Sequence, residues 1–189
     1  MKRNLIELLQ NNPVIADVNN DELLEKALLC GSDIIFVLYG NICTIAGIVE
    51  RIHAVEKVAL VDVDLVEGMS SKEVVVDFIL SATRADGIIS SKANILRAAK
   101  KKNLFTVHRF FLIDSTSYHN LPKQYSVSQA DVVEVLPGCM PKVLGWVKEL
   151  IHVPLIASGL VCEREDALFA LRAGAVAIST TTPEVWDCL

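Results

Sequence analysis

Charged residues interrupt the apolar segments of this sequence at positions where buried strands are expected to end. Asp62 and Asp64 close the segment VALVDVD, His108 and Arg109 close LFTVHR, and Glu134 lies within DVVEVLPG. A carboxylate buried without a partner is costly, so these acids need a cation, a metal ion, a ligand or a shared proton. Acids gathered with one guanidinium therefore predict a polar site that binds a ligand or transfers protons.

A purely structural interpretation of these charges is an open alternative. Buried carboxylates and an arginine also form internal ion-pair networks that support a fold without binding anything. Asp17, which ends the earlier segment PVIAD, is a weaker candidate for the same set. Because side chains alternate along a strand, Asp62 and Asp64 are expected on one face, and all of these groups are expected to converge at one end of the sheet.

Two segments near the carboxyl terminus carry the residue types that bind phosphate. Ser158 and Gly159 follow the apolar segment VPLIA, and Ser179 and Thr180 end AVAIST. Free backbone N–H groups present partial positive charge to an anion, glycine permits close approach, and hydroxyls donate hydrogen bonds. The alternative is that these residues only form turns and helix caps, which is their commoner use after strands.

Three further segments are weaker candidates. Ser90, Ser91 and Lys92 place a hydroxyl pair and a cation within one turn, although a capped helix with a solvated lysine explains them equally well. Glu67 precedes a glycine in what is otherwise a plain turn. Gly138 lies in the segment PGCMP, which indicates a rigid loop leading into a helix, with Gly138 near a ligand.

The apolar segments recur regularly enough to predict the fold. Eight of them begin 18 to 28 residues apart, which is room for one strand, one helix and two short loops. This alternation predicts right-handed βαβ units in a parallel sheet, and eight units predict a closed (β/α)8 barrel, or TIM barrel, forming a single domain over residues 1–189. An open doubly wound sheet is the alternative. In a barrel, the loops after the seventh and eighth strands commonly bind phosphate.

Two segments outside this repeat carry their own expectations. Leu5, Ile6, Leu8 and Leu9 favour an extra helix that plugs the bottom of the barrel. Between residues 114 and 129, Asp114, Asn120 and Pro122 break any clean period, so an irregular loop and a shortened helix are expected there.

The overall charge limits the kind of partner. A formal net charge of −5 and an isoelectric point near 5.4 argue against a protein whose whole surface attracts nucleic acid. The one basic cluster, predicted on a helix, is the candidate for a local RNA contact, although a solvated helix face is the commoner meaning of such a cluster. Its members are Arg97, Lys100, Lys101 and Lys102.

Composition also bears on compartment and cofactors. No segment approaches the roughly 18 uninterrupted apolar residues that a membrane helix needs, and the first residues do not form a signal peptide, so a cytoplasmic location is expected. Five scattered cysteines suggest reduced thiols, and they form neither a zinc motif nor a disulfide framework. The sequence therefore predicts no cofactor and identifies no metal-ligating residue, while a metal requirement stays open.

Several of these segments together resemble the bacterial glycerol uptake operon antiterminator family, the glycerol-3-phosphate-responsive regulatory proteins. The resemblance runs nearly end to end through PVIADV, VALVDVDLVEGMS, DGIISSKANILRAAKK, HRFFLIDS, DVVEVLPGCMPK, VPLIASGLV and AGAVAIST. Three features depart from the family pattern. Asp62 stands where a histidine is common, Ser158 stands where a second glycine is common, and residues 116–129 are more polar than usual.

The resemblance implies a cytoplasmic regulator that binds glycerol 3-phosphate and then acts on leader mRNA to prevent premature transcription termination. It also implies which residues line the ligand pocket; with Ser158 from the phosphate-loop argument, these candidates are Asp64, Glu67, Ser90, Lys92, Arg109, Glu134, Gly138, Ser158, Gly159, Ser179 and Thr180.

Two classes of function remain open at this point. The first is the ligand-sensing, RNA-binding regulator that the resemblance implies. The second is a small barrel enzyme acting on a phosphorylated metabolite, since paired carboxylates with a cation can bind magnesium or move protons. The fold alone does not separate them, because barrels host many chemistries.

Overall fold

The computed structural model describes residues 4–188, in which parallel strands alternate with helices. The strands are β1 (Val14–Val18), β2 (Ile34–Val37), β3 (Val58–Asp62), β4 (Gly87–Ser90), β5 (Phe105–Phe111), β6 (Val132–Leu136), β7 (Leu155–Ser158) and β8 (Ala177–Thr180). The helices are α1 (Leu5–Asn11), α2 (Asp21–Leu29), α3 (Ile45–Ala54), α4 (Val74–Ala82), α5 (Ala93–Lys101), α6 (Ser115–Ser128), α7 (Pro141–Leu150), α8 (Arg164–Arg172) and α9 (Pro183–Trp186).

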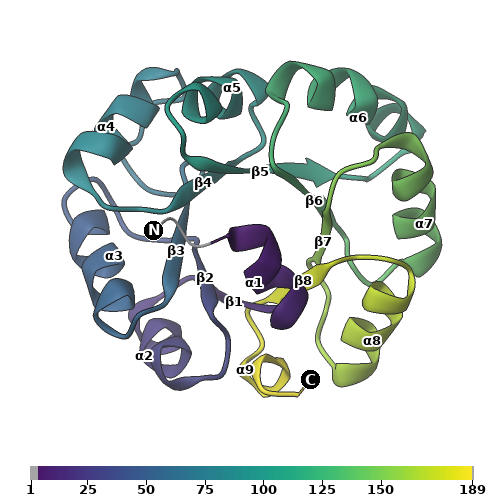
Figure 1. The fold of residues 1–189 in the computed structure, drawn as a ribbon, viewed down its shortest axis with the longest axis horizontal. Helices are drawn as coiled ribbons and strands as arrows, with labels where there is room; N and C mark the ends of the chain where they lie inside the picture. Colours follow the sequence, from purple (N-terminus) through teal and green to yellow (C-terminus); the bar gives the residue numbers. More distant parts are fainter. Residues whose placement is uncertain (1–3, 189) are drawn as a thin grey trace.

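The strands close into a barrel in their sequence order. Each strand pairs in parallel with the next, and β1 pairs with β8 in the register Val14 to Ile178 and Ala16 to Thr180. Viewed down the barrel axis, the helices form a ring around the strands (Figure 1). The predicted (β/α)8 barrel is therefore confirmed, and the open doubly wound sheet is excluded.

The barrel has two apolar layers because side chains alternate along every strand. Leu60 of β3 belongs to the cluster that fills the barrel interior, whereas Ala59 and Val61 belong to the cluster between the strands and the helices. Strands covered on both faces need continuous apolar segments, which explains why hydrophobic residues make up 52% of the sequence.

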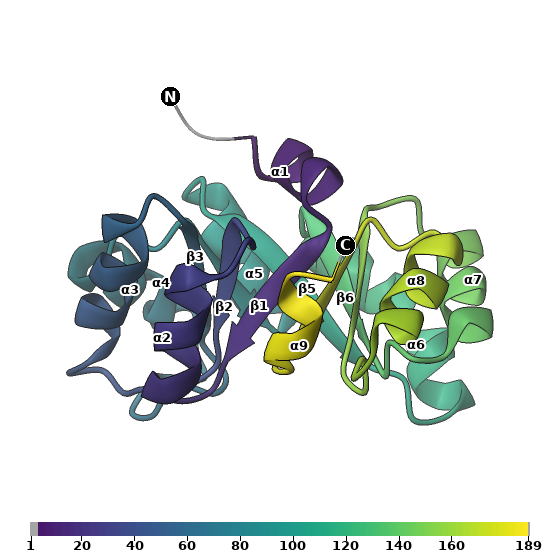
Figure 2. The ribbon, with the colours of Figure 1, turned by 90° about the horizontal axis from the view of Figure 1, so that it is seen from below.

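Helix α1 closes one end of the barrel. Its buried residues Leu5 and Leu9 belong to the interior cluster, in contact with the amino-terminal part of the barrel core. In the two views, α1 lies over the centre of the ring and at the end opposite to the strand arrowheads (Figures 1 and 2). The predicted plug at the bottom of the barrel is confirmed, and the carboxyl ends of the strands lie at the opposite end.

Helix α6 contradicts the expected irregular loop at 114–129. The segment forms a helix of 14 residues, which begins with a capping box: the Ser117 N–H donates to the Asp114 carboxylate at 2.7 Å, and the Asp114 N–H donates to the Ser117 hydroxyl. Pro122 lies inside this helix, and Leu121 is its one fully buried large apolar residue. With so few buried apolar residues, the segment shows no helical periodicity of hydrophobic residues in its sequence.

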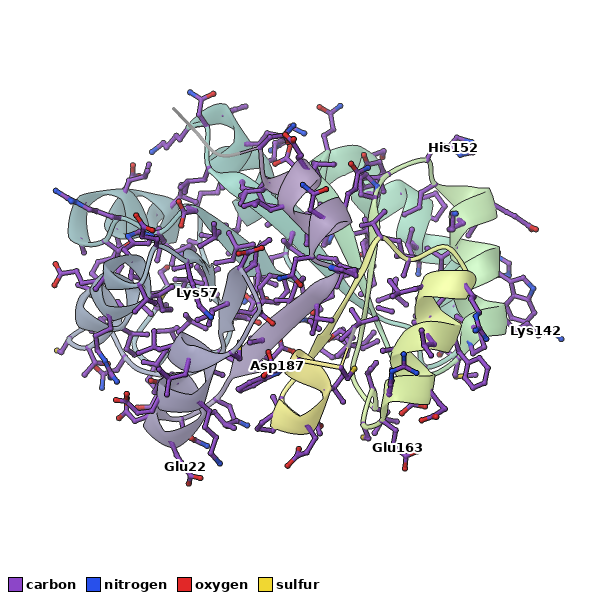
Figure 3. All side chains as sticks on the ribbon, turned by 60° about the horizontal axis from the view of Figure 1, so that its bottom comes forward. Glu22, Lys57, Lys142, His152, Glu163 and Asp187 are labelled. Carbon is purple, nitrogen blue, oxygen red and sulfur yellow. The ribbon has the colours of Figure 1, made fainter. Side chains whose placement is uncertain are left out.

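The loops at the carboxyl ends of the strands lead into the starts of the outer helices. Figure 3 labels Glu22 in the first turn of α2 and Glu163 at the N-cap of α8, both on the side away from α1. His152, just after α7, lies on the α1 side of the same view (Figure 3). Within residues 4–188, no helix is long and apolar enough to cross a membrane.

Candidate functional site

The last inward-facing layer before the open end of the barrel is polar. Each of its members follows an interior apolar residue by two positions, so strand alternation turns it toward the barrel axis. All are at least 92% buried. The layer, hereafter the polar layer, consists of Asp17 (β1), Asp62 (β3), Arg109 (β5), Glu134 (β6), Ser158 (β7) and Ser179 (β8).

Arg109 connects two acids of the polar layer. Its Nε donates to Glu134 Oε2 at 2.6 Å, a second guanidinium nitrogen donates to Oε1 at 3.3 Å, and the third nitrogen donates to Asp62. Burial alone would lower the pKa of Arg109, but the carboxylates of Glu134 and Asp62 raise it further above its usual value. Arg109 is therefore a permanent cation, and both predicted residues, Arg109 and Glu134, face the interior.

The hydroxyl of Ser179 joins the other side of the polar layer. Its Oγ lies 3.0 Å from Asp17 Oδ2, 3.2 Å from Glu134 Oε1 and 2.7 Å from Ser158 Oγ. These contacts reinforce the pairing of β8 with its neighbours β1 and β7, and they link β8 to β6, with which it does not pair in the sheet. The predicted residues Ser158 and Ser179 thus lie in one continuous network with Arg109.

The polar layer holds more acid than base. Three carboxylates and one guanidinium would carry a net charge of −2 if all were ionised, in a region largely removed from water. Burial raises the pKa of Asp17 well above its usual range, and the neighbouring Glu134 adds to that effect. Burial also raises the pKa of Asp62 to about 6, although Arg109 acts in the opposite direction. Protons therefore reduce the charge imbalance.

A second cluster lies beside the polar layer, at the ends of β3 and β4. The carboxylate of Asp64 accepts hydrogen bonds from the Ser90 hydroxyl at 3.1 Å, the Ser91 N–H at 2.7 Å and Lys92 Nζ at 2.8 Å. Partial burial acts to raise the pKa of Asp64, but the bonds from Lys92 and Ser91 hold it below its usual value. The predicted residues Asp64, Ser90 and Lys92 are thus brought together.

Strand alternation predicts that Asp62 and Asp64 lie on one face of the strand, but the Asp64 side chain does not point to the barrel axis as Asp62 does. Strand β3 ends at Asp62, and the turn that follows directs the Asp64 side chain toward β4. The two residues stay linked because the Asp64 N–H donates to Asp62 Oδ1 at 2.9 Å. Among the hydrogen bonds of residues 4–188, none joins Asp64 directly to Arg109 or Glu134.

His108 also departs from the expected convergence. Its ring lies on the outer face of β5, where Nδ1 is 2.8 Å from the hydroxyl of Ser128 in α6 and Nε2 is 3.4 Å from the carbonyl of Ser91. Burial lowers the pKa of His108 to about 4, so the ring is neutral near pH 7. Because side chains alternate along a strand and Arg109 points inward, His108 points outward. Its contact with Ser128 joins β5 to α6.

The loop after β6 packs directly on the end of β7. The Gly138 N–H donates to the carbonyl oxygens of Ser158 and Gly159, and a Cβ on Gly138 would lie 2.6 Å from the backbone nitrogen of Ser158. Gly138 is needed here for close backbone packing, and its buried position puts it under the β7 loop. The structure places Gly138 beside Ser158 in a packing position, and its expected proximity to a ligand stays a prediction.

The loops after β7 and β8 present backbone donors at the open end. Gly159 has φ +72°, which favours glycine, and its N–H donates to no acceptor among residues 4–188; the same holds for the N–H of Thr181. The Thr180 hydroxyl is already used, because it donates to the Val161 carbonyl at 2.6 Å and accepts from the Thr182 N–H. Thr180 therefore ties the two loops together.

The remaining predicted residues lie apart from the polar layer. Glu67 is exposed on the rim, where its backbone pairs with Asn41. All four members of the basic cluster at α5 are exposed, and two of them are in ion pairs: Lys100 with Asp131 at 3.1 Å and Lys102 with Asp77. In the part of the chain that the structure describes, no group of three or more His, Cys, Asp or Glu side chains has the geometry to hold a metal ion.

Two residues of these clusters were underestimated. Asp17 was only a weak candidate, yet it follows the interior residue Ile15 by two positions, and this spacing identifies it as inward-facing. Ser91 belonged to the hydroxyl pair noted in the sequence, and the structure shows that it supplies two hydrogen bonds to Asp64.

The fold and the polar layer define a (β/α)8 barrel with a buried charged network at the carboxyl ends of its strands. The model of one family, described as glycerol-3-phosphate responsive antiterminator, matches residues 14–186, and the chain belongs to this family. The resemblance inferred from the sequence is therefore confirmed.

Known proteins of this kind are similar along their whole length. The chain is 54% identical over 182 residues to an uncharacterized protein, YgcP, of Escherichia coli (strain K12), covering 96% of this chain and 95% of the relative. The crystal structure of a glycerol uptake operon antiterminator regulatory protein from Listeria monocytogenes has a TM-score of 0.90 at 28% identity, covering 93% of this chain and 95% of the other. A glycerol uptake operon antiterminator-related protein from Thermotoga maritima has a TM-score of 0.82 at 31% identity, covering 93% and 98%.

Proposed function

We propose that this protein binds glycerol 3-phosphate at the open end of its barrel and then acts on leader mRNA to prevent premature transcription termination of glycerol-uptake genes. The observation that carries this proposal is the family match over residues 14–186, which includes every strand and hence every residue of the polar layer. Such a regulator works on nascent transcripts, which places it in the cytoplasm.

The two ends of the effector have complementary surroundings in the barrel. Carboxylates and hydroxyls of the polar layer, among them Ser158 and Ser179, are suited to the hydroxyl groups of a polyol, and Arg109 supplies further N–H donors. The free N–H groups of Gly159 and Thr181 are suited to the phosphate, because a tetrahedral anion is bound well by convergent backbone donors. Glu134, which is fully buried, acts by holding Arg109.

Two groups of exposed cations are candidate RNA surfaces. Arg97 and Lys101 remain from the predicted cluster on α5. The second surface, missed from the sequence, is a groove of about 770 Å³ between the start of α5, α6 and the loop before α4. It brings Lys72, Lys92 and Lys123 together with amide side chains, which suits a phosphodiester backbone.

The proposed function is tested by measuring how the effector changes transcription termination. A template carrying a glycerol-uptake leader and its terminator is transcribed in vitro with the protein, with and without glycerol 3-phosphate. Read-through that rises only when protein and ester are both present supports the proposal; read-through indifferent to the ester contradicts it. Because coupling is reciprocal, leader RNA must tighten ester binding by the same factor that the ester tightens RNA binding.

The RNA surfaces are separated by paired charge reversals. Lys72→Glu with Lys123→Glu reverses the positive charge of the groove, and Arg97→Glu with Lys101→Glu reverses that of the α5 surface. Reversal of the pair that contacts RNA should weaken RNA binding and flatten its salt dependence. Reversal of the other pair should leave RNA affinity and its salt dependence unchanged. Ester affinity is the control in each case, since neither pair belongs to the polar layer.

One observation favours a catalytic alternative. Asp62 has a pKa of about 6, which suits a general acid or base near neutral pH. Against this role, both of its oxygens are already engaged, one by Arg109 and one by the Asp64 N–H. Prolonged incubation with glycerol 3-phosphate followed by phosphorus NMR tests the alternative, and a new phosphorus signal formed at an enzymatic rate would establish it.

A further inference from the structure

We propose that Asp17 reads a hydroxyl group of the bound effector, and that it does so as an uncharged carboxylic acid rather than as a carboxylate. This inference rests on the proposed binding of a polyol phosphate at the open end of the barrel, and it adds the residue that distinguishes a polyol from a plain alkyl phosphate.

The hydroxyl protons around Ser179 are too few for two ionised acids. Ser179 Oγ lies within hydrogen-bond distance of Asp17, Glu134 and Ser158, yet it carries a single proton. If Ser158 donates to Ser179, then Ser179 donates to one carboxyl group only. The other carboxyl group must bring its own proton, since two oxygen atoms without a proton between them repel each other at this distance.

The proton belongs on Asp17 because Glu134 already has a cation. Two nitrogens of Arg109 donate to Glu134, and the remaining donor goes to Asp62. Among residues 4–188, Asp17 has no ion-pair partner within 4 Å. The charged groups that face Asp17 are Glu134, Asp62 and Arg109, two of them acids. A neutral Asp17 leaves the layer with one excess negative charge in place of two.

One oxygen of Asp17 lacks a partner. Oδ2 contacts Ser179, but Oδ1 is buried and has no hydrogen-bond partner among the described residues. Buried polar groups are nearly always hydrogen-bonded, and leaving one unsatisfied is costly. Asp17 faces the barrel axis at the level of the polar layer and keeps 4% of its surface exposed, so the group that completes it comes from the open end.

A ligand hydroxyl is the group that fits this oxygen. It can donate to the carbonyl oxygen of a protonated carboxyl group, and it adds no charge to a layer that is already acidic. An ammonium group would instead favour the ionised form of Asp17, and a second phosphate would be repelled by Asp62 and Glu134. The chemistry therefore selects the hydroxyl-bearing end of the effector, with the phosphate left for the β7 and β8 loops.

The test compares two esters on four proteins by calorimetry. The esters are glycerol 3-phosphate and n-propyl phosphate, which has the same carbon chain without hydroxyls. The proteins are wild type, Asp17→Asn, Asp17→Leu and the matched control Glu149→Gln, an exposed carboxylate of α7. Thermal unfolding confirms that each variant is folded. The asparagine variant keeps an uncharged donor and acceptor, whereas the leucine variant keeps only the approximate size.

Wild type, the control and Asp17→Asn should prefer glycerol 3-phosphate over propyl phosphate by about tenfold or more, as one good hydrogen bond allows. Asp17→Leu should lose most of this preference, because the hydroxyl that faces Asp17 then has no partner. As pH rises far enough to ionise Asp17, wild type should lose affinity relative to Asp17→Asn, since titration of the ester is common to both proteins. An Asp17→Leu variant that retains the preference overturns the inference alone.

Failure of the proposed function has a different signature. If wild type binds neither ester, the proposed function and this inference both fall. The protonation of Asp17 is checked without ligand by carboxyl carbon NMR, in which the signal lost in Asp17→Asn identifies the residue. A protonated carboxyl group at pH 7 supports the inference, and an ionised one overturns it.

Discussion

Arg109 and Glu134 are cross-strand neighbours, paired in the parallel register of β5 and β6 and joined by two hydrogen bonds from the guanidinium to the carboxylate. Their strands are adjacent in the barrel, so both side chains point to the axis at the same height. Asp62 completes the group from β3. The three side chains are buried and mutually dependent, and removal of one leaves charge without a partner.

Replacing Arg109 by methionine should therefore be strongly destabilising. Asp62 and Glu134 would be left buried and unpaired, and breaking a buried pair in this way costs about 3 to 5 kcal/mol. Urea unfolding at pH 7 measures the loss, with Arg172→Met, an exposed arginine of α8, as the control. A loss within about 1 kcal/mol of the control, the range of an ordinary surface change, would show that the ion pairs contribute little.

Two buried groups should act in opposite directions on the pH dependence of stability. Asp62 has a folded pKa of about 6, above the roughly 3.9 of an unfolded chain, so its contribution is present at low pH and is lost as pH rises from about 4 to 6. His108 has a folded pKa of about 4, below the roughly 6.5 of an unfolded chain, so its contribution is present above pH 6.5 and is lost as pH falls toward 4.

Each of these two effects amounts to about 3 kcal/mol, so they largely cancel in the wild type. The variant Asp62→Asn should gain stability relative to wild type as pH rises from about 4 to 6, whereas His108→Gln should gain relative to wild type as pH falls over the same interval. Urea unfolding curves at closely spaced pH values measure both differences. Parallel curves for wild type and either variant would contradict the assignment of that residue.

Strand alternation explains which parts of the site are predictable from sequence. It places Arg109 and Glu134 inside the barrel because each follows an interior valine by two positions, and the same rule puts His108 outside. The rule fails for Asp64, since the strand ends at Asp62 and a turn sets the next direction. The hydrogen bonds of Asp64 to the loop after β4 depend on tertiary contacts between β3 and β4, which no local pattern encodes.

The fold is more predictable than the site because eight apolar segments at regular spacing leave few alternatives. Helix α6 is the exception. Its buried surface is small, so the main sequence signal for its start is the capping box of Asp114 and Ser117. Pro122 lies inside the helix, and a proline at this position predicts a shorter helix than the one observed. Capping residues in a polar segment are easily taken for a loop.

Gly138 should tolerate no side chain. The Cβ of Gly138→Ala would meet backbone atoms of Ser158 and Ala157 at 2.6 and 2.8 Å, and backbone cannot move aside as a flexible side chain can. Overpacking of this kind costs about 1 to 3 kcal/mol. Gly145 in α7 is the matched control, because its Cβ would meet nothing within 4 Å and alanine favours a helix by up to about 1 kcal/mol. Thermal unfolding should move in opposite directions for the two variants, and equal shifts would contradict the packing argument.

The plug at the bottom of the barrel should affect stability without affecting the site. Leu9 of α1 is 1% exposed and packs on the interior cluster, so Leu9→Ala should cost about 2 to 5 kcal/mol. The polar layer lies at the opposite end, so the affinity for glycerol 3-phosphate should stay unchanged at a temperature where the variant is folded. Urea unfolding and calorimetry measure the two quantities, and weakened ester binding by folded protein would show that the ends are coupled.

Effector binding is tested most directly by thermal unfolding of the wild-type protein across a concentration series of glycerol 3-phosphate, with glycerol and inorganic phosphate as separate controls. A ligand that binds only the folded state should stabilise it progressively, by about 2.7 kcal/mol at 100 times its dissociation constant. The ester should raise the unfolding temperature at concentrations where neither control does, and phosphorus NMR should show the ester unchanged afterwards. An unfolding temperature that does not respond to the ester, or responds equally to inorganic phosphate, would contradict a glycerol-3-phosphate site in this barrel.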